Sequence, residues 1–403
     1  MQGIKIDFQL NALPFYRSAQ KNGQKSLEID ASDGKITVNK WYSHSEKPLT
    51  MIASLSGGEK ITLIFYDFRI ELYVNGTLVD EEWPIGDALF SLGDEILPSE
   101  GIELSAYRQP SEPEPSVIST FENAEGWRPD GIFVGDCMPY TREGEYHVLY
   151  LKDRRHHKSK WGMGAHQWAH ISTRDFNTWQ VHPMAVEITK PWEGSICTGS
   201  HIKRGDKEYL YYTVRCANNM PAIISRSISS DGYHFTKDES FGFTVSEKYH
   251  APSARDPKVF LGEDGKYHMI LTTSLKNEER NGCLAHYTSS DLEAWHEEEN
   301  PIYVVPNTAQ PECPDYFKYN GKYYLVFSLW GRARYLVSNE PFDGFLSVDD
   351  TLIPCAGVPK CAEWEGKLVF TGFKVIDGYA GTMTFNTATS DESGKLIFET
   401  SET

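Results

Sequence analysis

Hydrophobic and polar residues alternate in short runs along the chain, which is the pattern of half-buried β-strands. Two such runs, Lys60–Tyr66 and Arg69–Val74, stand in the N-terminal part, and Asn75-Gly76 follows the second. An Asn-Gly pair after an alternating run predicts a tight hairpin turn. We therefore expect residues 1–109 to form a small β-sandwich.

The rest of the chain repeats one motif, a glycine-containing hairpin tip followed by an apolar strand. The tip glycines, 45 to 61 residues apart, are Gly144, Gly205, Gly265, Gly321 and Gly366. Four tips are followed by a second turn that closes on an aromatic residue, namely Trp179, Phe235, Trp295 or Phe345. Two hairpins per repeat give the four strands of a propeller blade. Five tips predict a five-bladed β-propeller, whereas one large sandwich would not produce such regular spacing.

A proline-rich stretch separates the two patterns. Residues 109–115 read Gln-Pro-Ser-Glu-Pro-Glu-Pro, which excludes a helix or a central strand. The sequence therefore predicts an all-β protein with a sandwich at 1–109, a linker at 110–116 and a propeller at 117–403. A length of 403 residues also favours two domains.

Charge and composition restrict the classes of molecule that the protein is expected to bind and the compartment in which we expect it. The net charge of −18 argues against nucleic acid and against an anionic membrane surface, but it permits a small neutral sugar or oligosaccharide. The sequence has neither a run of 18 apolar residues nor the pattern of a signal peptide at its start. Its 7 cysteines form no Cys-x-x-Cys pair, as expected in a reducing compartment. We expect a cytoplasmic protein.

Three acidic residues occupy equivalent places in the repeat. Asp136, Asp256 and Glu312 precede the glycine of their own tip by 8, 9 and 9 residues. The strand before each tip should be the innermost of its blade, so these acids should face one another across the central channel. The other two repeats carry small residues near this register, Thr198-Gly-Ser200 and Ala356-Gly357, which would leave room for a ligand.

Crowded carboxylates suit the cleavage of glycosidic bonds. Like charges close together raise at least one pKa, and a glycosidase needs one ionised and one protonated carboxyl group. Any one of these acids alone is better explained as an ordinary loop carboxylate. Three acids in register favour a shared site.

Short phrases around the acids reinforce this interpretation. They are Arg255-Asp-Pro257, Glu312-Cys-Pro-Asp315, Trp161-Gly162 with Gln167-Trp-Ala-His170, and Cys197-Thr-Gly-Ser200. Their order and spacing, over roughly residues 125–340, resemble glycoside hydrolase family 32, the invertases, levanases and inulinases.

The resemblance implies a retaining glycosidase that removes a terminal β-fructofuranoside from sucrose, sucrose phosphate or a fructo-oligosaccharide, without metal or cofactor. It makes Asp136 the nucleophile, Glu312 the general acid/base and Asp256 the stabiliser of the transition state. Substrate binding is assigned to Arg255, Trp161, Trp168, Thr198 and Ser200, with one of the two tryptophans as a platform for the sugar ring.

The sequence also departs from the family pattern. Gly135-Asp-Cys-Met replaces its usual Asn-Asp-Pro-Asn, Leu151 replaces a glutamine, and the sandwich precedes the propeller. Three other functions stay open: cleavage of an arabinofuranoside, glycosyl transfer by the same residues, and sugar binding without catalysis.

Two further expectations concern single segments. The basic run at 153–160 is either a solvated loop or a loop at the channel mouth that meets a sugar phosphate. Cys313 follows Glu312 in a strand, so alternation predicts that its side chain points away from the channel.

Overall fold

The computed structural model describes residues 2–9, 15–19, 25–42, 46–66, 69–83, 101–108, 116–119, 126–129, 131–154, 166–217, 220–348, 352–354 and 357–399. These residues form strands and turns, and the helical element among them is a single 3₁₀ turn at Ala251–Ser253. The all-β prediction is confirmed. The chain divides into two compact units, one of residues 1–113 with 188–194 and one of residues 114–187 with 195–403.

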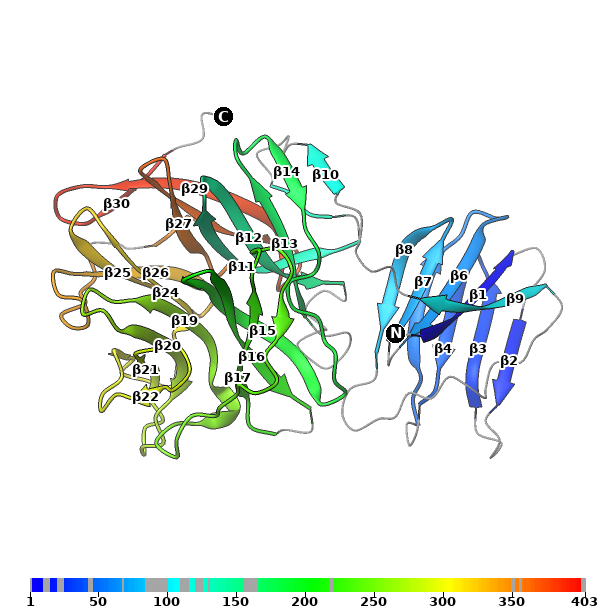
Figure 1. Cartoon of the computed structure of the whole chain (residues 1–403), viewed down its shortest axis with the longest axis horizontal. Coiled ribbons are helices and arrows are strands. Elements are labelled where there is room, and N and C mark those ends of the chain that lie inside the picture. Colours follow the sequence, from blue (N-terminus) through cyan, green and yellow to red (C-terminus); the bar gives the residue numbers. More distant parts are fainter. Residues whose placement is uncertain are drawn as a thin grey trace. The chain divides into compact units, whose positions relative to one another are not determined.

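The first unit contains two antiparallel sheets (Figure 1). One has the order β8-β7-β6-β1-β9, made of β8 (Thr77–Glu82), β7 (Arg69–Val74), β6 (Lys60–Tyr66), β1 (Gln2–Gln9) and β9 (Ile102–Arg108). The other runs in chain order through β2 (Phe15–Ala19), β3 (Lys25–Ser32), β4 (Lys35–Lys40) and β5 (Leu49–Ser54). Asn75 and Gly76, with φ of 50° and 81°, form the predicted tight turn between β7 and β8.

The two sheets of this unit share one hydrophobic cluster. Ile6 and Phe65 enter it from the first sheet, and Leu27 and Val38 enter it from the second. All four side chains are fully buried. Burial of a side chain of this size contributes roughly 1.5–3 kcal/mol, so the shared cluster holds the two sheets together.

All five predicted hairpins are present in the second unit. They are β11–β12 (Phe133–Arg142, Glu145–Asp153), β15–β16 (Glu193–Arg204, Lys207–Cys216), β19–β20 (Arg255–Leu261, Tyr267–Ser274), β24–β25 (Glu312–Tyr319, Lys322–Leu329) and β27–β28 (Lys360–Trp364, Lys367–Val375). The five tip glycines have φ between 62° and 77°, the left-handed region that glycine adopts without steric penalty.

Further strands extend these hairpins. They are β10 (Ser116–Ser119), β13 (Gln167–Thr173), β14 (Thr178–Val181), β17 (Ile223–Ser229), β18 (Thr236–Lys237), β21 (Gly282–Ser289), β22 (His296–Glu297), β23 (Tyr303–Val304), β26 (Arg332–Ser338), β29 (Gly381–Ser390) and β30 (Leu396–Phe398). Three sheets among the described residues follow the orders β15-β16-β17-β18, β19-β20-β21-β22 and β24-β25-β26. In the remaining sheet the order is β10-β14-β13-β12-β11-β29-β28-β27.

The last strands of the chain close onto the first strands of the second unit. Val134 of β11 pairs with Gly381 of β29. Farther along β29, Trp127 and Met383 form an isolated bridge, in which each backbone nitrogen lies 2.9 or 2.6 Å from the carbonyl oxygen of the other residue. These pairings join residues near 130 to residues near 380, and they bring the two ends of the second unit into one sheet.

Among the described residues, no helix has the length and apolar character needed to cross a lipid bilayer.

Candidate active site

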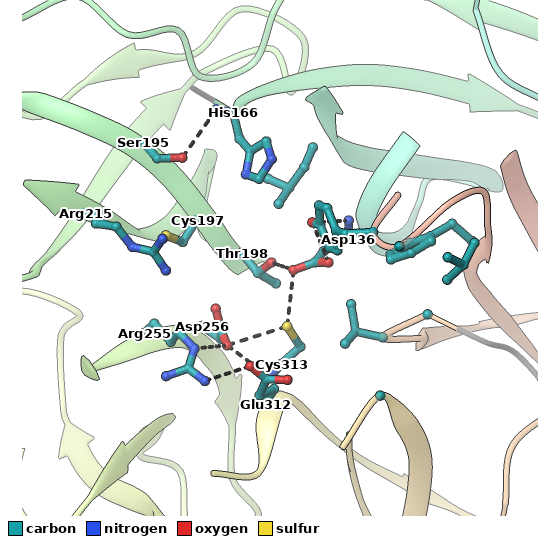
Figure 2. Close-up of a pocket in the computed structure, with 18 residues that line it drawn as sticks. Asp136, His166, Ser195, Cys197, Thr198, Arg215, Arg255, Asp256, Glu312 and Cys313 are labelled. Atoms are coloured by element: carbon teal, nitrogen blue, oxygen red, sulfur yellow. Dashed lines mark hydrogen bonds and ion pairs between the residues drawn. The ribbon is translucent and has the colours of Figure 1, made fainter. Parts of the chain in front are cut away.

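One pocket of the second unit is lined by Asp136, Asp256 and Glu312 (Figure 2). The three acids come from β11, β19 and β24, the first strands of three different hairpins. The sequence register thus led to side chains that the structure brings together. Arg255 and Thr198 also line this pocket.

Each of these three strands is irregular at its acidic residue. The pairing register shifts between Val134 and Cys137, between Arg255 and Lys258, and between Glu312 and Asp315. Asp256 and Cys313 have φ of 60° and 52°, which is unusual for residues other than glycine. Such bulges re-aim side chains and often lie beside active sites. Here they turn neighbouring side chains into the same pocket.

Asp136 is 8% exposed and is held on both carboxylate oxygens. Its Oδ1 accepts a hydrogen bond from the Tyr379 hydroxyl at 2.9 Å. Its Oδ2 accepts one from the Thr198 hydroxyl and one from the Cys313 thiol, whose Sγ lies 3.2 Å away. Three donors therefore fix the orientation of this carboxylate.

Asp256 is buried beside Asp136. It accepts a hydrogen bond from the Cys313 backbone N–H at 3.0 Å, and its Oδ2 lies 3.4 Å from Arg255 Nε. Burial raises the pKa of Asp256, the Arg255 guanidinium opposes this shift, and the Asp136 carboxylate adds to it. Folding therefore holds this side chain in a position that disfavours its ionised form.

Arg255 pairs with two of the acids, Asp256 and Glu312. Its Nη2 donates to Glu312 Oε1 at 2.9 Å, and its Nη1 donates to Gln310 Oε1 at 2.6 Å. The Glu312 side chain is 44% exposed, in contrast to Asp136 and Asp256. The pocket thus offers one carboxylate to solvent and keeps the other two buried.

The expectation for Cys313 was wrong. Its side chain lies in the pocket, where Sγ is 3.2 Å from Asp136 Oδ2 and 3.5 Å from Asp256 Oδ2 (Figure 2). Strand alternation fails at this residue because the bulge after Glu312 gives Cys313 a positive φ. Burial and the two carboxylates raise the pKa of the thiol well above its usual value, so it is a neutral donor between them.

Two of the predicted sugar contacts lie outside the pocket lining. Trp168 is fully buried and its indole N–H donates to the Cys197 carbonyl at 3.0 Å. A sugar ring therefore cannot stack on it, which corrects the prediction for this residue. Ser200 is also buried; it donates to the Pro257 carbonyl at 2.9 Å and accepts the Val259 N–H at 2.8 Å. Ser200 supports the Arg-Asp-Pro segment instead of contacting a ligand.

Trp161 and residues 155–160 of the basic run lie outside the described residues. At the start of that run, Asp153 Oδ2 pairs with His166 Nε2 at 3.2 Å.

Several pocket residues were not found from the sequence. Tyr379, His166 and Arg215 line the pocket but have no place in the register before a hairpin tip. Tyr379 lies in the turn before β29, and His166 directly precedes β13. A tyrosine between Gly378 and Gly381 marks a turn, but nothing local connects that turn with Asp136.

The chain matches known proteins over the segment that carries these residues. Residues 136–346, more than half of the chain, match the model of the glycosyl hydrolases family 32 N-terminal domain. The chain is 26% identical to a sucrose-6-phosphate hydrolase of Vibrio alginolyticus over 50% of its own length and 40% of that protein. It is 27% identical to a probable sucrose-6-phosphate hydrolase of Psychromonas ingrahamii over 63% of its length and 46% of that protein.

A solved structure of a fructan exohydrolase has a similar fold. Fructan 1-exohydrolase IIa of Cichorium intybus superimposes with a TM-score of 0.56 at 18% identity, over 69% of this chain and 60% of that one. The chain therefore spans less than half of the two curated relatives and 60% of this structure. The family match contains all three pocket acids, and with it we conclude that the chain belongs to glycosyl hydrolase family 32.

Proposed function

We propose that this protein is a retaining glycosidase that cleaves terminal β-fructofuranosides, such as sucrose, sucrose phosphate or fructo-oligosaccharides. The observation that carries the proposal is the connected set of three acids in one pocket, with Asp136 held by three donors and Glu312 exposed. A double displacement at an anomeric carbon requires one carboxylate as the nucleophile and a second carboxyl group as the acid and base.

The three acids then divide the steps of the mechanism among them. The Asp136 carboxylate attacks the anomeric carbon while Glu312 protonates the leaving oxygen, which gives a covalent glycosyl-enzyme. Glu312 next removes a proton from water, and the water oxygen displaces Asp136. The ring gains positive charge in both transition states, which the nearby Asp256 stabilises.

The choice of a fructoside rests on the relatives. Two of them are named sucrose-6-phosphate hydrolase and raffinose invertase, and a similar structure is a fructan exohydrolase. One wall of the pocket is apolar, since Leu151, Phe373 and Val375 line it. For this reason the substrate panel below includes other furanosides.

We also propose the finer architecture that the sequence predicts. Along the chain, a sandwich at 1–109 and a linker at 110–116 precede a five-bladed propeller at 117–403. Five hairpins with equivalent tips support the blades. The hydrophobic cluster shared by two sheets supports the sandwich. One boundary between the two compact units falls between residues 113 and 114, inside the proposed linker.

The test is a panel of sucrose, sucrose 6-phosphate, kestose and aryl furanosides, assayed with wild type, Asp136→Asn and Glu312→Gln. We expect wild type to release fructose first as the β-anomer, visible by NMR, and both variants to lose at least roughly 10³-fold in kcat. First release of the α-anomer, or activity that survives Asp136→Asn, would refute the mechanism. If the protein hydrolysed arabinofuranosides alone, its substrate would be an arabinofuranoside and not a fructoside. If it bound sugars without hydrolysing any, it would be a sugar-binding protein and not an enzyme.

A further inference from the structure

Lys360 is a lysine in the interior of the second unit. It is the first residue of β27, and only 3% of it is exposed. It is not among the described residues that line the pocket of Asp136. Lysine is almost never fully buried unless its charge has partners, so the contacts of Lys360 indicate what it does in this fold.

The Lys360 ammonium binds two backbone carbonyls that belong to other hairpins. Its Nζ donates to the Gly199 carbonyl at 3.1 Å and to the Pro314 carbonyl at 2.8 Å. Gly199 lies on β15 and Pro314 lies on β24, so one side chain joins the first strands of three hairpins. Hydrogen bonds from a charged donor are about twice as strong as those between neutral groups, and both strands are therefore held firmly at these residues.

Each of the two carbonyls directly follows a donor to Asp136. The residue before Gly199 is Thr198, and the residue before Pro314 is Cys313. The Thr198 hydroxyl and the Cys313 thiol both donate to Asp136 Oδ2. The buried ammonium thus fixes the backbone beside two of the three donors that orient this carboxylate.

A buried carboxylate fixes the position of Lys360 in turn. Asp315 is fully buried, and it accepts the backbone N–H of Cys361, the residue after Lys360, at 2.8 Å. The charge of Asp315 is paired with a different lysine, since Asp315 Oδ1 lies 2.6 Å from Lys258 Nζ. The Lys360 ammonium forms no ion pair with a described carboxylate, and its two bonds are to carbonyls.

The charge of Lys360 acts on the pocket acids. Burial lowers the pKa of its ammonium, and Asp315, Cys313 and Asp256 oppose this shift. Burial and the nearby carboxylates raise the pKa of the Cys313 thiol, and Lys360 opposes that shift. A positive charge at this place therefore favours the ionised forms of the groups around it.

The remaining titratable groups near these residues are the same in every variant below. Those near Lys360 are Lys258, Cys361 and Glu363. Those that share the pocket with Asp136 and Asp256 are Arg255, Glu312, Tyr379, His166, Arg215 and Cys197.

We propose that Lys360 is a positioning residue for this active site. Its ammonium holds the two segments that carry Thr198 and Cys313, and it supplies a buried positive charge next to the acids. This inference rests on the proposed function, in which Asp136 must be ionised and oriented in order to attack. Lys360 acts through the residues that contact the substrate and does not contact it itself.

The test compares Lys360→Met, which removes the charge and the donors, with Lys360→Arg, which keeps both. With the best substrate of the panel above, Lys360→Met should lower kcat roughly 10–100-fold and leave KM within about twofold of wild type. The acid limb of its kcat/KM profile should move to higher pH by about half a unit or more, because ionised Asp136 loses a nearby positive charge. Lys360→Arg should keep the acid limb of wild type.

The matched control is Lys40→Met in the first unit. Lys40 is 1% exposed and donates to the Trp41 carbonyl at 2.8 Å and to the Ser26 hydroxyl at 3.1 Å. This variant should have a lower Tm, because two buried acceptors lose their donor, but the kcat and acid limb of wild type. Where Lys360→Met does not fold, Lys360→Gln replaces it, since an amide keeps two hydrogens for the carbonyls without the charge. The acid limb should then move in the same direction.

Three results would overturn the proposal: the kcat and acid limb of wild type in Lys360→Met or its replacement, an equal shift of the limb in Lys360→Arg, or an equal loss of kcat in Lys40→Met. In each of these cases an active wild type leaves the proposed function intact. An inactive wild type would instead refute the proposed function, and the role of Lys360 with it.

Discussion

Asp136 depends on donors from distant parts of the chain. Thr198 lies on β15, Cys313 on β24 and Tyr379 just before β29. A carboxylate that accepts hydrogen bonds on both oxygens has little rotational freedom. The nucleophile that we propose is therefore positioned before substrate arrives, which is how an active site avoids reorganisation during the reaction.

Replacing Tyr379 by Phe tests this positioning. We expect kcat for sucrose to fall about 10–100-fold, because a hydrogen bond to a charged group contributes roughly 1.5–3 kcal/mol. KM should change little. The control is Tyr211→Phe, which removes a buried hydroxyl bonded at 2.9 Å to the Leu292 carbonyl and should leave kcat unchanged. Equal losses of kcat in both variants would contradict the role given to Tyr379.

Asp256 links catalysis to stability. Burial raises its pKa above the ordinary value of 3.8, so the folded protein holds this proton more tightly than the unfolded chain does. The stability contributed by this carboxyl therefore falls as the pH rises from 3.8 through the raised pKa. The variant Asp256→Asn lacks this titration. It should be inactive, and its Tm relative to wild type should increase from about pH 4 to about pH 7.

Asp291→Asn is the matched control for this pH dependence. Backbone N–H groups of Glu293 and Ala294 lower the pKa of Asp291, so its carboxylate contributes stability above its unfolded pKa and loses it as the pH falls. Relative to wild type, the Tm of Asp291→Asn should therefore stay nearly constant from about pH 4 to about pH 7 in scanning fluorimetry, because this carboxyl titrates below its ordinary value of 3.8. A similar rise of the relative Tm in both variants over this interval would speak against buried-charge destabilisation at Asp256.

At this scale the sequence predicted the acids better than their partners. Their equivalent spacing before a hairpin tip predicted that Asp136, Asp256 and Glu312 lie together, and the structure places all three in one pocket. It failed for Cys313 because strand alternation assumes regular pairing, and a bulge breaks that pairing. Trp168 was misplaced because an indole ring suits a core as well as a sugar face, and only its burial distinguishes the two.

Hairpin tips are the elements that the sequence predicted most directly. Each tip contains a glycine with positive φ, and this glycine can be recognised in the sequence. The residue before it is a weaker sequence signal, although Glu143, Asn320 and Glu365 also have positive φ, near 50°. Two adjacent residues with positive φ form a type I′ turn, which favours Asn-Gly. Asn320-Gly321 follows this preference, whereas the other two tips carry glutamate.

The substitution Glu365→Asn should therefore stabilise the protein. The left-handed conformation penalises a longer side chain by roughly 1–2 kcal/mol, and asparagine recovers about half of that. Thermal unfolding should show a higher Tm with unchanged kcat. Asp206→Asn is the control, since Asp206 follows Gly205 in its turn and is not among the residues with positive φ. A similar rise in Tm for Asp206→Asn would mean that lost charge, not backbone conformation, is responsible.

The pairings of Trp127 with Met383 and of Val134 with Gly381 act on the whole second unit. No local pattern predicts them, because bridges and bulges between distant segments leave no periodic trace in either segment. The sequence supplied the repeated hairpins, but the way in which the last strands complete the first sheet needed the structure.

Gly126→Ala tests this closure. A Cβ at Gly126 would lie 2.2 Å from the Met383 carbonyl oxygen, and the residue has φ of +89°. We expect a loss of more than about 2 kcal/mol in the free energy of unfolding, measured by urea denaturation. Gly131→Ala is the control, because Gly131 also has positive φ but no atom within 4 Å of the added Cβ. Its loss should stay near 1 kcal/mol, the usual penalty of the backbone conformation alone.

The bond between Tyr379 and Asp136 also sets an order of events during synthesis. The two residues are 243 positions apart, and a ribosome adds about 5–20 residues each second. Asp136 therefore leaves the ribosome roughly 12–50 seconds before the tyrosine that orients it is made. Until then the sheet that contains β11 lacks β29, so Asp136 of a growing chain is missing one of its three donors and the strand edge that β29 later covers is unpaired.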